Sequence, residues 1–291
     1  MQKTKKAIFH ADSVDGIRRP KASLKLLQKI LSVGGKTIEC SVIFPVKKIA
    51  GMICLFIFIF LYVPADEVVF QQGVTNEFSG GSAYSGTRDT YINISNSRNY
   101  GGITSFAYGL TGSFYALLRF DLSSLTHLAS KITIHSASIE LVPRAGSGRG
   151  EIDFGVYALN SVHAGWVEGT GEGGAADLVL GATCGTHFLY DTVKWSGGGV
   201  FSTADYDFSN PLYTGRSSLT SNNIITLPPD IVLSWIKTPA NNAGIVFVAN
   251  DTTDALYTQV FSSRYSTVTH RPKLVINYTV FQSSVRLIMI H

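Results

Sequence analysis

The chain contains little charge and few cysteines. Charged side chains make up 15% of its 291 residues, and there are three cysteines. Two of them precede residue 65 and Cys184 stands alone behind it, so the later part has no disulfide framework and no Cys-x-x-Cys metal or redox pair. A part of this length can bury an adequate core without one. We expect Cys184 to be a small, buried apolar side chain.

Recognisable catalytic motifs are lacking as well. A serine hydrolase needs a nucleophile turn such as G-x-S-x-G and a zinc hydrolase needs clustered histidines, and the chain has neither. The run Gly169–Gly174 fits the dinucleotide pattern G-x-G-x-x-G but follows no convincing parallel strand. A glycosidase pair such as Asp121 with Glu168 stays open, because folding brings distant carboxylates together. No residue set meets the geometry of catalysis, so we predict that the protein is not an enzyme.

Positive charge is concentrated at the front of the chain. Residues 1–65 hold 11 of the 24 basic residues and 3 of the 20 acidic ones, which leaves 13 basic against 17 acidic residues in the remainder. Neutralising phosphates requires a basic face, so this mildly acidic remainder argues against nucleic acid as a partner. We therefore expect a protein that binds no nucleic acid; separately, we expect it to be a monomer.

The sequence before residue 66 indicates export. Two lysines at 47–48 precede the apolar run 49–63, and small residues then lead to Ala65. This order predicts a signal peptide over 47–65, cleaved after Ala65, and hence a secreted, extracellular protein. The alternative is a signal-anchor at the cell surface, with 49–63 as the membrane contact if it is not cleaved. The run is shorter than the roughly 20 residues of a spanning helix.

Residues 1–46 form a basic leader that is too long for an ordinary signal peptide. Within it, Lys21–Leu31 places lysines on one helical stripe and leucines on another, as in an amphipathic helix on an anionic membrane. A disordered leader, or sequence upstream of the true start, is the simpler interpretation, and we exclude it from the fold. The tail 281–291 is short and partly apolar, with no evident role.

The stretch Phe114–Ser124 has the clearest strand pattern of the chain. Ala116 to Leu122 supply an apolar residue at every second position, and Arg119 and Asp121 are neighbours on the opposite face. The apolar face would lie in a core. The charged pair is either a solvated face or the polar floor of a ligand or metal site.

Similar alternation recurs over residues 66–280 and indicates an all-β fold. Strand patterns follow one another at spacings of roughly 8–12 residues with turns between them, which is typical of an antiparallel β-sandwich. The basic, glycine-rich Arg144–Gly150 predicts a turn, and Trp166–Gly199 an irregular functional or mobile loop. Pro228–Ile236 predicts one short helix, because it begins with proline and repeats apolar residues four apart.

Short motifs in a fixed order add a family resemblance. In chain order they are Asp89–Ile92, Asn99–Gly102, Ser136–Leu141, Trp166–Thr170, Trp235–Ile236, Asn241–Ile245, Phe261–Arg264 and Arg271–Tyr278. Together they resemble the DNRLRE-type domain, which is related to a carbohydrate-binding module family of secreted bacterial proteins. The resemblance implies a jelly-roll-like β-sandwich over 66–280 that binds a polysaccharide without acting on it. Where the family has an acidic residue after Ser-Ser-Arg, this chain has Tyr265.

Binding such a ligand needs rings that stack on sugar C–H faces and ionic groups that bind carboxylates. Trp195 is the ring that we expect to be best exposed, because glycines follow it, and arginines and a lysine would bind an acidic plant or algal polysaccharide. The predicted ligand-binding residues are Asp89, Tyr91, Arg119, Asp121, Lys194, Trp195 and Arg264.

We expect no cofactor other than a structural calcium ion. Asp251 with Asp254, or Asp205 with Asp207, offers hard oxygen ligands on a turn, although aspartate is also an ordinary turn residue. The sequence thus favours a secreted, non-catalytic carbohydrate-binding module. A structural or adhesive cell-surface module is the alternative, and a polysaccharide lyase or glycoside hydrolase ranks third.

Overall fold

A computed structural model describes residues 27–33, 36–42, 65–148, 150–250 and 255–281. The chain divides into two compact units, Met1–Pro64 and Ala65–His291. In the first unit β1 (Leu27–Val33) and β2 (Lys36–Val42) form an antiparallel hairpin. Residues 27–31 of the leader, for which an amphipathic helix was the alternative to disorder, are therefore part of a strand and not of a helix. The predicted signal segment up to Pro64 and the tail after Phe281 lie outside the described residues.

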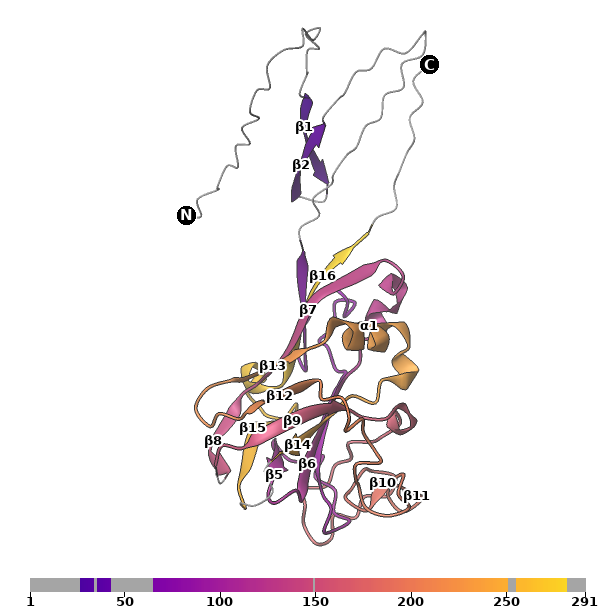
Figure 1. Ribbon diagram of the computed structural model, residues 1–291, viewed down its shortest axis with the longest axis vertical. Helices are drawn as coiled ribbons and strands as arrows, with labels where there is room; N and C mark the ends of the chain where they lie inside the picture. Colours follow the sequence, from indigo (N-terminus) through magenta and orange to yellow (C-terminus); the bar gives the residue numbers. More distant parts are fainter. Residues whose placement is uncertain (1–26, 34–35, 43–64, 149, 251–254, 282–291) are drawn as a thin grey trace, which may run out of the picture. The chain divides into compact units, whose positions relative to one another are not determined.

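The second unit contains two main sheets and a small hairpin (Figure 1). The strands of the eight-stranded sheet are β4 (Thr87–Asn93), β5 (Ser105–Gly109), β6 (Phe114–Phe120), β8 (Pro143–Gly148), β9 (Asp153–Ala158), β12 (Tyr213–Arg216), β14 (Ile245–Ala249) and β15 (Tyr257–Phe261). Those of the four-stranded sheet are β3 (Asp66–Gln71), β7 (Ile132–Leu141), β13 (Asn223–Leu227) and β16 (Lys273–Val280). The hairpin pairs β10 (His187–Leu189) with β11 (Val193–Lys194).

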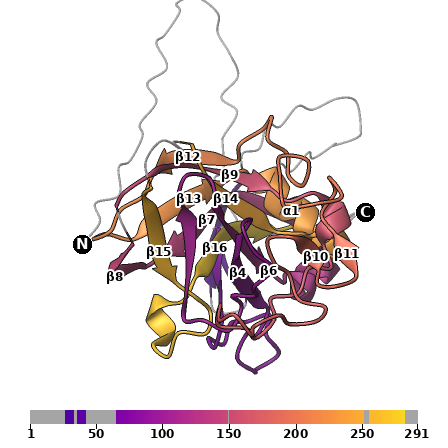
Figure 2. The same ribbon diagram turned by 90° about the horizontal axis from the view of Figure 1, so that it is seen from below.

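All pairings in both sheets are antiparallel, as predicted for the sandwich. The larger sheet runs β12-β9-β14-β6-β5-β15-β8, with β4 also paired to β6, and the smaller runs β13-β7-β16-β3. Figure 2 shows β4 and β6 side by side, and in both views the β10–β11 hairpin lies on the same side of the unit as α1. The strand pair β4–β6 positions the site described below.

The predicted short helix is confirmed as α1 (Pro229–Lys237), with proline in its first turn. Its buried face consists of Val232, Trp235 and Ile236, which join the core between the sheets. Four short 3-10 helices also occur in the described part: η1 (Ser123–Leu128), η2 (Ser161–His163), η3 (Pro239–Asn241) and η4 (Val268–His270). No helix among the described residues is long and apolar enough to cross a membrane.

Two strand expectations need correction. The predicted turn Arg144–Gly150 is largely the strand β8, which pairs only with β15 and so lies at the sheet edge. An edge strand tolerates proline and glycine because it needs hydrogen bonds on one side only. The strands β12 and β13 were not predicted, since both are short, β12 is largely polar, and the two isoleucines of β13, Ile224 and Ile225, are adjacent and do not alternate.

Both faces of the larger sheet are buried over β6, which gives the unit two cores. The predicted apolar face is confirmed, because Ala116, Leu118 and Phe120 lie in the main core between the sheets. The opposite face contributes Leu117 to a second core that contains aromatic residues of the irregular segment after Trp166. This segment therefore folds over the sheet, and Trp166 at its start lies against Arg119 of β6.

Candidate binding site

Three of the short sequence motifs meet beside β4. The Asp89 carboxylate accepts a hydrogen bond of 2.7 Å from the Ser263 backbone N–H. The next residue, Arg264, donates from Nε to Glu168 Oε1 at 3.1 Å and from Nη2 to the Gly169 carbonyl at 3.0 Å. Residues far apart in the chain thus form one ionic cluster, in which Asp89 and Glu168 are buried and Arg264 is exposed.

Asn99, from a fourth motif, holds the irregular segment against this cluster. Its side-chain amide donates to the carbonyls of Glu168 at 2.7 Å and Thr183 at 3.0 Å, and its oxygen accepts from Gly171 N–H at 2.7 Å. A Cβ at Gly101 would overlap the Glu168 carbonyl, so this position requires glycine. The Asn-Tyr-Gly-Gly motif therefore fixes the backbone position of Glu168 through hydrogen bonds and close packing.

Arg119 lies on a buried tryptophan. Its guanidinium carbon is 5.1 Å from the centre of the Trp166 ring, a cation–π distance. The indole N–H of Trp166 donates to the Ala243 carbonyl at 2.8 Å, and the neighbouring Asn242 amide donates to the Phe120 carbonyl at 2.8 Å. The buried Trp166 ring consequently packs against the guanidinium of Arg119 and is not itself an exposed stacking ring.

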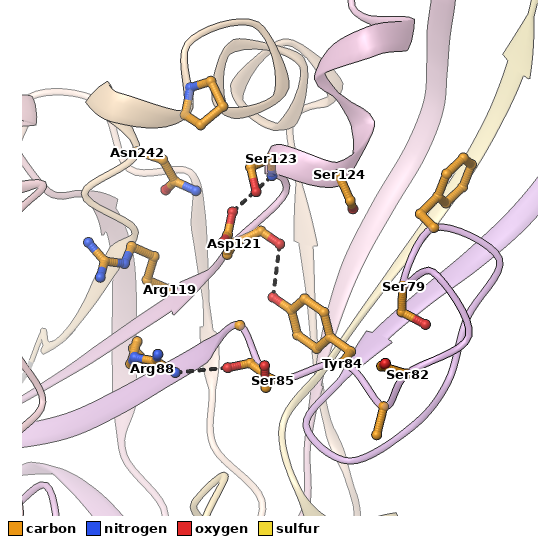
Figure 3. A pocket seen from close by; sticks show the side chains of 14 residues that line it. Ser79, Ser82, Tyr84, Ser85, Arg88, Arg119, Asp121, Ser123, Ser124 and Asn242 are labelled. Carbon is orange, nitrogen blue, oxygen red and sulfur yellow. Dashed lines mark hydrogen bonds between the residues drawn. The ribbon is translucent and has the colours of Figure 1, made fainter.

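A cavity of about 670 Å³ opens at the end of β6 (Figure 3). Asp121 lies in its centre, where its carboxylate accepts from Ser123 N–H at 2.8 Å and its carbonyl accepts from the Tyr84 hydroxyl at 3.0 Å. Figure 3 shows Arg88, Arg119 and Asn242 on one side of the cavity. Most of the remaining lining is small: the serines Ser79, Ser82, Ser85, Ser123 and Ser124 with Ala83 and Gly86, and beside them Phe78 and Pro239.

A second cavity, of about 720 Å³, adjoins the first. The two share Ser85, Arg88 and Arg119 in their lining, so the arginines stand between them. The second cavity is also lined by Gln72, Thr87, Gly165, Trp166, Val167, Glu168, Gly169, Thr170, Ser263 and Arg264. We call the two cavities together the arginine groove. Its charged lining residues are three arginines against two carboxylates, those of Asp121 and Glu168.

The two shared arginines are direct cross-strand partners. Arg88 on β4 lies opposite Arg119 on β6 in the antiparallel register, so both side chains emerge on the same face of the sheet. Arg88 donates to the backbone carbonyls of Ser85 and Thr87, each at 2.9 Å. Burial lowers the pKa of Arg119, and the charge of Arg88 lowers it further. The fold thus maintains a like-charge pair at the centre of the groove.

The two buried carboxyls hold their protons more tightly than usual. Burial raises the pKa of Asp89 to about 6, against the opposing hydrogen bonds from Ser263. Burial, and next the Asp89 carboxylate, raise the pKa of Glu168 to about 7, although Arg264 acts in the opposite direction. Near neutral pH this part of the groove therefore changes its charge.

Four of the predicted ligand residues occupy this site and three do not. Arg119, Asp121 and Arg264 line the groove, and Asp89 lies buried beside it. The other three, Tyr91, Lys194 and Trp195, are absent from the lining of both cavities.

The prediction that Trp195 is exposed is wrong. Only 1% of its surface is accessible, it belongs to the second core, and its indole N–H donates to the Cys184 carbonyl at 2.9 Å. The glycines after it suggested an open loop, but the loop folds back over the sheet. Lys194 is exposed on β11, and Tyr91 is half-buried and stacks on Tyr100 at a centroid distance of 4.2 Å. Cys184 is buried, as predicted.

Of the predicted calcium residues, the two that the structure describes, Asp205 and Asp207, line neither cavity. Asp251 and Asp254 lie outside the described residues. The alternative Asp205 is buried and accepts from the backbone N–H groups of Ser196 at 2.7 Å and Ser202 at 2.9 Å. The described part of the chain contains no group of three or more His, Cys, Asp or Glu side chains that could hold a metal ion.

Several groove residues were not predicted from the sequence, notably Arg88, Tyr84, Asn242 and Ser263. A signal for Arg88 was available, because it directly precedes the alternating residues that begin at Asp89 and, in a strand that starts earlier, projects from the opposite face. Arg88 becomes part of the groove because its strand pairs with β6, and the strand pattern alone does not reveal that pairing.

Comparisons of the chain with models of known protein families and with curated proteins gave no match. The resemblance to the DNRLRE-type domain therefore stays a prediction, and the function is argued from the groove itself.

Proposed function

We propose that this protein is a secreted, non-catalytic carbohydrate-binding module and that the arginine groove binds an acidic polysaccharide. The observation that carries the proposal is the Arg88–Arg119 pair. Like charges directly opposite each other on neighbouring strands destabilise a sheet. In the described part of the chain neither arginine forms an ion pair with a carboxylate, and both donate to backbone carbonyls instead. Asp121 acts on Arg119 only through space, so an anionic ligand would supply a direct ionic partner for the pair.

The chemistry of the groove suits uronic acids. An arginine fork can bind a carboxylate through two parallel hydrogen bonds, and two adjacent forks can bind successive sugars of a charged chain. The serines around Asp121 and the Asn242 amide offer small donors and acceptors for sugar hydroxyls. Two adjoining cavities, of about 670 and 720 Å³, favour an extended chain over a single small molecule.

The test compares the purified full-length chain with its Arg88→Ala variant in gels that contain alginate, pectate or neutral xylan. We expect retardation by the acidic polymers, and a loss of affinity of about tenfold or more in the variant, since a hydrogen bond to a charged group contributes roughly 1.5–3 kcal/mol. Arg216→Ala is the matched control, because this arginine is exposed on β12 and lines neither cavity. It should bind like the wild type.

Two results would overturn the proposal. If none of the acidic polymers retards the wild type, a structural or adhesive surface module becomes the better interpretation. New reducing ends or unsaturated uronides would identify a degrading enzyme, for which Glu168 is the residue to examine, because it lines the groove and has a pKa raised to about 7.

A further inference from the structure

Three rings that belong to neither core gather beyond the Arg264 end of the groove. Phe261 ends β15, Tyr265 follows Arg264 directly, and His270 ends η4. All three are half-buried, and none belongs to either apolar core.

The three rings do not form a linear stack with Phe261 in the middle. The centroid separations are 4.0 Å for Phe261–Tyr265, 5.0 Å for Phe261–His270 and 5.7 Å for Tyr265–His270. If Phe261 lay between the other two, their separation would equal nearly the sum of the first two distances. Tyr265 and His270 therefore lie on the same side of Phe261, and their planes are parallel within 5°.

Arg271 joins this surface to the groove. Its Nε donates to the Tyr265 carbonyl at 2.7 Å, and its Nη1 donates to the Gln72 carbonyl at 2.9 Å. Gln72 lines the second cavity, as does Arg264, the residue before Tyr265. Both the backbone and the Arg271 side chain thus hold the ring cluster next to the groove wall.

The groove itself offers little ring surface. In the second cavity Trp166 is buried and covered by Arg119, and in the first cavity Tyr84 is buried and Phe78 is half-buried against the main core. A polysaccharide that enters the groove through its carboxylates therefore lacks the apolar contact that sugar C–H faces make with flat rings.

We infer that the parallel rings of Tyr265 and His270, supported by Phe261, are a stacking subsite for a sugar unit that extends beyond the second cavity. The inference rests on the proposed function and deepens it: the arginines bind the carboxylates, and the platform of Tyr265 and His270 binds the next sugar through its C–H face. Short oligomers would fill the groove alone, and longer ones would also reach the platform.

The experiment measures affinity for uronate oligomers of two and of six or more units by calorimetry, with the full-length chain. We expect Tyr265→Ala to bind the long oligomer about three- to tenfold more weakly, as the loss of one aromatic contact predicts, and the short one unchanged. Tyr265→Phe keeps the ring and should bind like the wild type. Phe208→Ala removes an exposed ring that lines neither cavity and should also change nothing.

The outcomes separate the two proposals. If Tyr265→Ala binds the long oligomer as tightly as the wild type, the platform is not a subsite, while the groove proposal stands. If the wild type binds neither oligomer, both fail. Should Tyr265→Ala not fold, His270→Ala removes the parallel ring and must show the same dependence on oligomer length.

Discussion

At the scale of single residues, the groove combines two kinds of electrostatic strain. Arg88 and Arg119 oppose each other across two strands, and Asp89 and Glu168 are buried together beside Arg264. Neither arrangement helps the chain to fold, because one brings like charges together and the other removes carboxylates from water. Residues that are unfavourable for folding and gather in one cavity indicate a site for a ligand.

The buried carboxyls predict a dependence of stability on pH. Their pKa values are about 6 and about 7 in the folded protein and near 4 when unfolded, so the folded state binds more protons over the window between them. The free energy of unfolding should therefore fall as the pH rises from about 5 to about 7.5 and then level off. Thermal unfolding across this range measures the slope.

Glu168→Gln should reduce that slope to the part that Asp89 contributes, because glutamine does not titrate. Asp207→Asn, which changes an exposed carboxyl outside the groove, should leave it unchanged. A wild type whose stability is constant or rises between pH 5 and 7.5 would contradict the raised pKa values.

At the scale of elements, the irregular segment after Trp166 is a structural layer. It places Trp195 and Phe201 on the outer face of the larger sheet, where their rings pack at a centroid distance of 4.8 Å. Its glycines permit this path. The prediction of an irregular or mobile loop was based on the composition of the segment. Composition does not show which aromatic rings will pack on the face of a sheet.

Trp195→Ala should consequently destabilise the protein. The loss of a fully buried indole and of its hydrogen bond to the Cys184 carbonyl should lower the free energy of unfolding by about 3–5 kcal/mol, measured by urea denaturation. The neighbouring Lys194→Ala changes an exposed side chain and should stay within about 0.5 kcal/mol of the wild type. Equal stability of the two variants would show that Trp195 is not a core residue.

At the scale of the whole molecule, the sandwich is a unit in itself. Residues Ala65–His291 form one of the two compact units, and its main core draws on both sheets and α1. We predict that a chain beginning at Ala65 unfolds in one cooperative transition, with a Tm within about 3 °C of the full-length protein. Calorimetry of both proteins tests this. A much lower Tm would mean that residues 1–64 contribute to the stability of the sandwich.

The sequence by itself determined the strands with strict alternation, the helix that begins with proline, and the all-β class, because these depend on side-chain periodicity along a few neighbouring residues. It also indicated Arg119, Asp121 and Arg264. Only the tertiary structure decided that Arg88 faces Arg119, that Trp195 is buried, and that Tyr265 lies parallel to His270. These features depend on strand pairing and on the path of long loops. Both bring together residues that are far apart in the chain, and the local sequence around each residue does not indicate its distant partner.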